Sequence, residues 1–156
     1  MEMPQPTEAH LKLARLAGEW SGEDTMFPSD WDPEGSTAQA HHSIRVAIGG
    51  FGVVVDMEQR RDGEVVFSGV GVWTVDPQDH DHECVLYWFD SIGMGMETFR
   101  GGWEGDVLTV SSKGSTGRFR LTYDLSEADT LRARMDTSPD GDQWKGMFEG
   151  TYRREA

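Results

Sequence analysis

The sequence lacks the features that mark membrane-spanning and disulfide-bonded proteins. It contains one cysteine, Cys84, so no intrachain disulfide and no thiolate zinc cluster can form. No apolar run approaches the roughly 18 residues of a membrane helix. The N-terminal residues also lack the basic and apolar regions of a signal peptide. We therefore expect a cytoplasmic protein with no membrane partner.

Positive charge is also scarce. The 156 residues include 14 Lys and Arg against 28 Asp and Glu, which gives a formal net charge of −14. Because such a chain repels phosphate groups, we expect no nucleic-acid partner. A solvated acidic surface accounts for the charge without any partner.

Proline is rare, at six residues, whereas the 19 glycines indicate tight turns. A chain of this length forms one domain. One amphipathic helix is predicted over residues 7–17, with Thr7 as the N-cap and Gly18 as the left-handed residue after its end. We expect residues 1–17 to form an N-terminal segment and capping helix, and residues 18–156 a single β-barrel domain.

The rest of the chain alternates between apolar and polar residues, as strands do. In RFRLTYDL, for example, Phe119, Leu121 and Tyr123 share one face. A meander of about ten strands leaves two exposed edges, which closure into an antiparallel up-and-down β-barrel removes. The predicted strands lie near 18–27, 36–48, 51–61, 64–76, 82–90, 93–101, 105–111, 117–125, 130–137 and 143–153.

A tryptophan flanked by glycines opens the first predicted strand. Gly18 ends the helix without steric penalty, and Trp20 is expected to point inward and plug one end of the barrel. Gly22 shares the face of Trp20 and is expected to leave room above its ring.

A helix followed by Gly-x-Trp-x-Gly and a meander resembles the calycin superfamily of lipocalins, fatty-acid-binding proteins and avidins. More narrowly, LAGEWSGEDTMF, GGFGVVVDME, FDSIG and GTYRR resemble a bacterial calycin-like family catalogued as a domain of unknown function. The resemblance covers about residues 13–153. It implies a lipocalin-like barrel with a cavity, and no established activity.

The chain is also similar, more distantly, to nitrobindin, a haem-binding barrel. That resemblance implies a haem-ligating histidine near the C-terminus, but no histidine follows His82. Met147 and Tyr152 could in principle bind the haem iron, but packing within their strand explains both residues more simply. We therefore expect no haem and no other cofactor.

Aromatic residues and methionines suit the apolar walls of a binding cavity. They concentrate in LYWFDSIGMGMETF, where Met94 and Met96 are expected to project together from one strand. An inward Arg45 would need an anionic partner, whereas an outward one is solvated, and the sequence leaves both open. The candidate ligand-binding residues are Trp20, Arg45, Trp73, Trp88, Met94, Met96 and Tyr123.

Two groups of histidines are candidate metal ligands. His80 and His82 lie in DPQDHDHEC among carboxylates, but the segment reads as a polar hairpin loop, so no metal site is assigned. His41 and His42 are adjacent on a strand, so they face opposite sides and cannot bind one metal together.

The sequence predicts binding of a small, mostly apolar or amphipathic ligand inside the barrel, with no catalytic residue assigned. One alternative is a filled barrel that acts through self-association, for instance as a homodimer. A second is a small-molecule enzyme that uses buried carboxylates, although no motif of an enzyme family is present.

Overall fold

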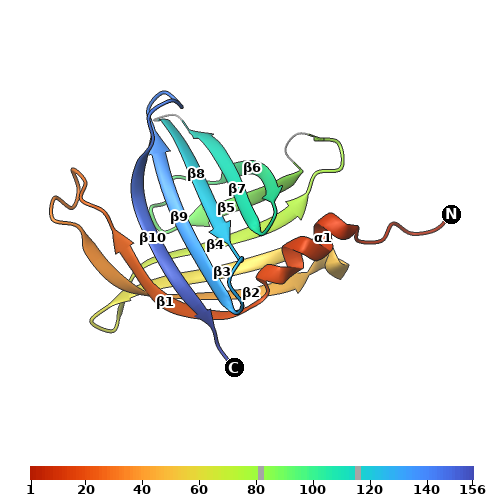
Figure 1. Cartoon of the computed structure of the whole chain (residues 1–156), viewed down its shortest axis with the longest axis horizontal. Helices are drawn as coiled ribbons and strands as arrows, with labels where there is room; N and C mark the ends of the chain where they lie inside the picture. The colour runs from red at the N-terminus through yellow and green to blue at the C-terminus, as the bar shows by residue number, and fades with distance from the viewer. Residues whose placement is uncertain (81–82, 115–116) are drawn as a thin grey trace.

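The computed structural model of the chain describes residues 1–80, 83–114 and 117–156. It contains a closed barrel of ten antiparallel strands, preceded by one short α-helix (Figure 1). In chain order the elements are α1 (Glu8–Leu13), η1 (Ala14–Leu16), β1 (Gly18–Met26), β2 (Ser36–Ala47), η2 (Ile48–Gly50), β3 (Gly52–Arg61), β4 (Glu64–Val75), β5 (Cys84–Asp90), β6 (Glu97–Glu104), β7 (Val107–Gly114), β8 (Gly117–Asp124), β9 (Thr130–Ser138) and β10 (Lys145–Arg154).

Each strand pairs with its neighbours in the sequence, and β1 pairs with β10 to close the sheet. The predicted up-and-down barrel of about ten strands is therefore confirmed. Closure leaves no unpaired edge strand in this sheet, as the prediction required.

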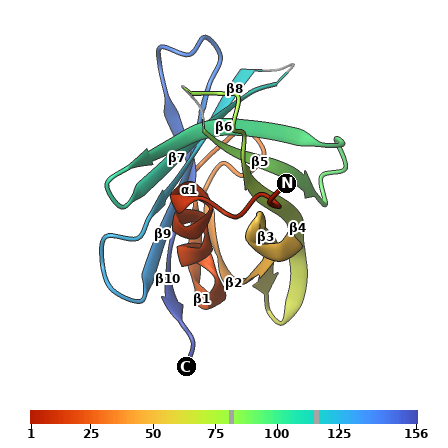
Figure 2. The same ribbon diagram turned by 90° about the vertical axis from the view of Figure 1, so that its right-hand side faces the viewer.

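The predicted helix over residues 7–17 is shorter than expected and changes to a 3₁₀ turn at Ala14. His10 accepts a hydrogen bond from the backbone N–H of Thr7 at 3.0 Å, which fixes the first turn. The helix lies across one end of the barrel (Figure 2) and buries Leu13 and Leu16 against the inward-facing side chains. Such a short helix depends on this packing for its stability.

Trp20 lies at the helix-covered end and is completely buried. Its indole N–H donates to the carbonyl of Leu16 at 2.9 Å, and the guanidinium of Arg154 lies 4.2 Å from its ring centre. The predicted plug is thus present, but Gly22 has another role. A Cβ there would lie 2.0 Å from the carbonyl oxygen of Thr151, so Gly22 allows β10 to pair closely with β1.

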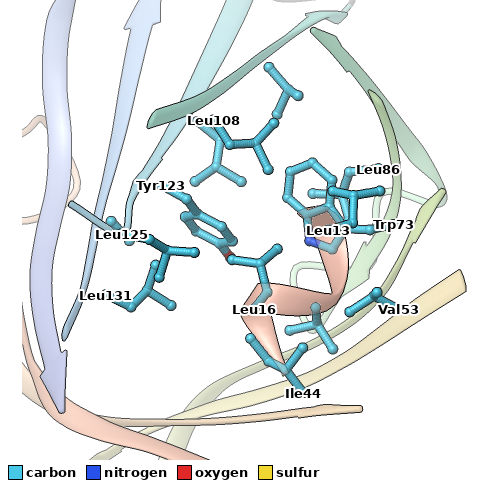
Figure 3. Packing of buried hydrophobic residues seen from close by; sticks show 14 of the residues in the cluster. Leu13, Leu16, Ile44, Val53, Trp73, Leu86, Leu108, Tyr123, Leu125 and Leu131 are labelled. Carbon is cyan, nitrogen blue, oxygen red and sulfur yellow. The ribbon is translucent and has the colours of Figure 1, made fainter. Parts of the chain in front are cut away.

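The core fills this half of the barrel (Figure 3). Large side chains from α1, η1 and most strands meet there, with Trp73 and Tyr123 facing each other at a ring separation of 5.7 Å. None of the described helices is long and apolar enough to cross a membrane. The end of the barrel below the helix is thus densely packed with buried side chains, whereas several large side chains at the opposite end are only half-buried.

Candidate ligand site inside the barrel

The end of the barrel opposite α1 has a looser apolar lining. Several of its large inward-facing side chains are only half-buried, whereas their polar neighbours Gln59 and Ser112 and the side chains near the helix are buried. Solvent therefore reaches between them from the rim formed by the hairpin loops. The half-buried residues are Met26, Phe67, Trp88, Phe119, Met135 and Phe148.

A carboxyl group lies below this rim. Asp24 of β1 is completely buried and accepts hydrogen bonds from the hydroxyl of Tyr152 and, at 2.6 Å, from the amide of Gln59. Burial raises the pKa of the Asp24 carboxyl, although both hydrogen bonds oppose that shift. Gly150 lies opposite Asp24 on β10, and a Cβ there would collide with the carboxylate and with the Tyr152 hydroxyl.

His42 lies deeper in the barrel, and its ring forms no hydrogen bond with the described residues. Its side chain is buried, and neither ring nitrogen is bonded to any part of the chain that the structure describes. The ring packs against Tyr152 at a centroid distance of 4.5 Å. Burial lowers the pKa of His42 to about 4, so the imidazole is neutral at physiological pH. A neutral imidazole carries one donor and one acceptor, and both are unused here.

Two of the predicted residues add further polar atoms. The indole N–H of Trp73 is buried and has no partner within the described residues. Burial, together with the nearby charge of Asp24, raises the pKa of the Tyr123 hydroxyl. Both side chains lie inside the barrel (Figure 3), so the interior holds more polar groups than its own hydrogen bonds use.

Trp88 forms part of the wall on the β4–β5 side. Its indole N–H donates to Asp90 at 2.9 Å, and its ring lies across two inward-facing glycines, Gly69 and Gly71. A Cβ at Gly69 would lie 2.1 Å from the ring. The alternate glycines of this strand therefore create the space that Trp88 occupies.

Three of the seven predicted residues do not line the interior. Met94 and Met96 lie in the loop before β6, which begins at Glu97 instead of residue 93, and both are exposed. Gly93 and Gly95 have positive φ angles, which break the predicted strand. Arg45 lies on the outer face of β2 and is exposed. Trp20, Trp73, Trp88 and Tyr123 do lie inside, and their contact with a ligand stays a prediction.

The outer face of β1 and β2 carries a chain of polar contacts. The Nε2 atom of His41 lies 2.8 Å from Glu19, and its Nδ1 atom lies 3.0 Å from the hydroxyl of Ser21. The order of groups is that of a serine hydrolase, but Ser21 donates its one hydrogen to Glu155 at 2.5 Å. Since β1 is paired on both sides, the backbone around Ser21 also offers no oxyanion hole.

Two hollows lie elsewhere on the described surface. One, of about 560 Å³, lies on the outer wall of β2–β5 beside Val70 and Phe89. The other, of about 220 Å³, lies at the helix end beside Trp20 and Arg154. Neither contains Asp24 or His42.

The predicted loop at residues 76–84 lies partly outside the described residues, because His82 falls at a position the structure does not describe. Asp76 instead forms an ion pair with Arg100 at 3.0 Å, and His80 is exposed. No group of three potential metal ligands occurs within the described residues. Cys84 is buried, and desolvation raises the pKa of its thiol to about 11, as expected of a structural cysteine.

Sequence reasoning missed Asp24 and Gln59, and it assigned Tyr152 to strand packing only. Trp20, Gly22 and Asp24 are alternate residues of one strand and so share one face. The inward position of Asp24 therefore follows from the strand period. The alternation alone did not distinguish Asp24 from the other carboxylates, because the chain contains 28 Asp and Glu residues. The sequence leaves open which of the two histidines faces the interior; the structure buries His42 together with Ala38, Ala40 and Ile44 on the same face of β2.

These features define a small calycin-like barrel that is packed at its helix end and polar in its middle. The chain belongs to the family described as a protein of unknown function (DUF1579), which it matches over residues 5–154. The predicted relationship to a calycin-like domain of unknown function is therefore confirmed. No curated protein is similar enough in sequence to match the chain.

Solved structures share the fold at low sequence identity. Rv2717c from M. tuberculosis superposes with a TM-score of 0.72 at 14% identity, covering 96% of this chain and 99% of its own. The S-type phycobiliprotein lyase CPES from Guillardia theta has a TM-score of 0.62 at 9% identity, covering 97% and 99%. At these identities the similarity establishes the fold alone.

Proposed function

We propose that the protein binds a small, mostly apolar molecule between the rim and the middle of the barrel. His42 carries the proposal, because its two unpartnered ring nitrogens are inside the barrel. A buried polar atom without a partner costs roughly 1–3 kcal/mol, so a group that meets it contributes to binding.

The lining of the rim suits an apolar body. Aromatic rings and methionines surround the entrance, and small residues line the β1–β2 wall below it. Ala38 and Ala40 lie opposite Asp24 and Gly22 in the strand pairing, so no large side chain of β2 covers the carboxyl. A molecule that enters from the rim therefore meets apolar rings first and polar atoms later.

Filling the interior beside Asp24 tests this proposal. Ala38→Phe places a ring in the interior, whereas Gln39→Phe places one on the outer face of the same strand. Nile red, a neutral apolar dye, is expected to bind the wild type and Gln39→Phe with one-to-one stoichiometry. Ala38→Phe is expected to weaken binding at least about tenfold. Equal binding by all three proteins, each with a cooperative thermal transition, would place the dye elsewhere and contradict the proposal.

Native mass spectrometry of the purified protein supplies the identity of any resident molecule. A stoichiometric adduct that is released on denaturation names the ligand. The absorption spectrum of the same sample is expected to lack the Soret band of haem, since the histidine implied by nitrobindin is absent from the C-terminal strand.

The enzyme alternative needs a buried carboxyl of raised pKa, and Asp24 is one. Binding is favoured over catalysis because both Asp24 oxygens already accept hydrogen bonds. Self-association rests on exposed Val66, Val70 and Phe89 on the outer wall. Light scattering that gives a monomer mass across a range of protein concentrations would remove that alternative.

A further inference from the structure

Asp24 is a buried carboxyl with no positive partner. Within the described residues, no Lys or Arg forms an ion pair with it, and its partners are the neutral side chains of Tyr152 and Gln59. Removing a carboxylate from water costs several kcal/mol even after the protein relaxes. The two hydrogen bonds to Asp24 offset only part of that cost, and a positive charge beside the carboxylate would offset more of it.

The charges nearest the interior do not supply it. Arg154 lies at the opposite end over Trp20 and bonds to Asp129 and the carbonyl of Ala17. Arg61 lies at the rim, is exposed, and bonds to the carbonyl of Thr37. Two further acids lie on the inner face towards the rim: Glu97, which accepts a bond from a serine, and Asp90, which accepts one from Trp88. The described part of the interior is therefore acidic.

Aromatic rings accompany this acidic interior. Tyr152 contacts both Asp24 and His42: its hydroxyl donates a hydrogen bond to Asp24, and its ring packs against His42. The rings of Phe67, Trp88 and Phe119 follow towards the rim. The faces of such rings attract cations, and a carboxylate beside them strengthens that preference.

We propose that the ligand is an organic cation, a protonated amine on an apolar body, whose charged group lies against Asp24. This inference rests on the proposed function and adds the sign of the ligand's charge. The ammonium supplies the missing counter-charge, the rings enclose the apolar body, and a neutral His42 meets a further polar group of the ligand. The net charge of −14 favours the approach of such a molecule.

Three probes that share one chain and differ in the head group test the proposal: octylamine, which is protonated at neutral pH, octanol and octanoate. Calorimetry on the wild type is expected to give octylamine about tenfold tighter binding than octanol, and octanoate the weakest. In Asp24→Asn the preference for the amine is expected to fall to roughly twofold or less, with octanol binding unchanged.

Glu23→Gln is the matched control, since it removes the same formal charge one residue away on the exposed face of β1. It is expected to keep the preference for octylamine, which separates the interior carboxyl from the overall charge. If Asp24→Asn does not fold, the wild-type series still decides. Octanol binding as tightly as octylamine overturns the inference and leaves the proposed function standing. No binding of any probe overturns the proposed function itself.

Discussion

His41 and His42 are neighbours in β2, but their environments are opposite. His41 lies on the outer wall, where both ring nitrogens have partners in Glu19 and Ser21. His42 points inward, and neither of its ring nitrogens has a partner among the residues that the structure describes. The imidazole on the outer face, which water reaches, therefore has its hydrogen bonds formed. The imidazole on the inner face, where water is largely excluded, does not.

The contrast extends to the carboxylates of the two faces. Glu19 on the outer face accepts bonds from Ser43 and His41, which hold the pKa of its carboxyl below the ordinary value. Asp24 on the inner face has a raised pKa because desolvation outweighs its hydrogen bonds. On the outer face, the hydrogen bonds from neighbouring side chains outweigh the cost of desolvating Glu19. On the inner face they do not outweigh the cost for Asp24, and a bound cation would reduce it. This difference is the physical basis for proposing a ligand site in the interior.

The largest expected effect separates the packed end from the surface. Trp20→Ala removes a completely buried ring and is expected to lower the free energy of unfolding by about 3–5 kcal/mol. Trp31→Ala is the matched control, because Trp31 is 98% exposed, and is expected to change it by less than about 0.5 kcal/mol. Urea denaturation followed by circular dichroism measures both. Similar losses in the two variants would contradict the assigned plug.

The pH dependence of stability distinguishes the two histidines next. Because burial lowers the pKa of His42 from 6.5 to about 4, the unfolded chain binds a proton more readily between these values. Stability from this residue is therefore complete above pH 6.5 and decreases as the pH falls towards 4. The loss is about 3 kcal/mol. Urea titrations at several pH values are expected to show it in the wild type.

Asp24 acts in the opposite direction, since its raised pKa favours the folded state as the pH falls. The difference between the wild type and His42→Phe isolates the histidine, because both proteins retain Asp24 and His41. That difference is expected to change by about 3 kcal/mol between pH 7 and pH 4. A pH-independent difference would mean that His42 is solvated or paired in solution.

At neutral pH, His42→Phe is expected to raise the free energy of unfolding by about 1–3 kcal/mol. The change keeps an aromatic ring against Tyr152 and removes two unpartnered polar atoms. The same variant is expected to lose affinity for Nile red, whereas a purely structural His42 would leave binding of the dye intact. A destabilised His42→Phe protein would show that the nitrogens have partners, such as internal water, without a ligand.

Much of the fold was predictable because it depends on short-range patterns. The alternation of RFRLTYDL and the glycines around Trp20 determined the strands and the covered end. The errors lie where local signals conflict. The strand with Met94 and Met96 was predicted to begin at residue 93, directly after a turn, but the positive φ angles of Gly93 and Gly95 keep that segment in a loop.

The site was less predictable because it depends on which polar residues share the interior. Asp24, Gln59 and Tyr152 come from β1, β3 and β10, and only barrel closure brings them together. No spacing within one segment encodes such a contact. His42 had an apolar strand face as its signal, but the absence of partners for its ring emerges only from the neighbouring strands.

The smallest expected effect concerns the outer wall. His41→Gln retains a polar side chain near Glu19 and Ser21, and all of these groups stay in contact with water. Since exposed ion pairs and hydrogen bonds contribute little, the free energy of unfolding is expected to change by less than about 0.5 kcal/mol. Ligand affinity is expected to stay within roughly twofold of the wild type. A loss of binding in His41→Gln, with His42 untouched, would move the site from the interior to the outer face and reverse the comparison between the two histidines.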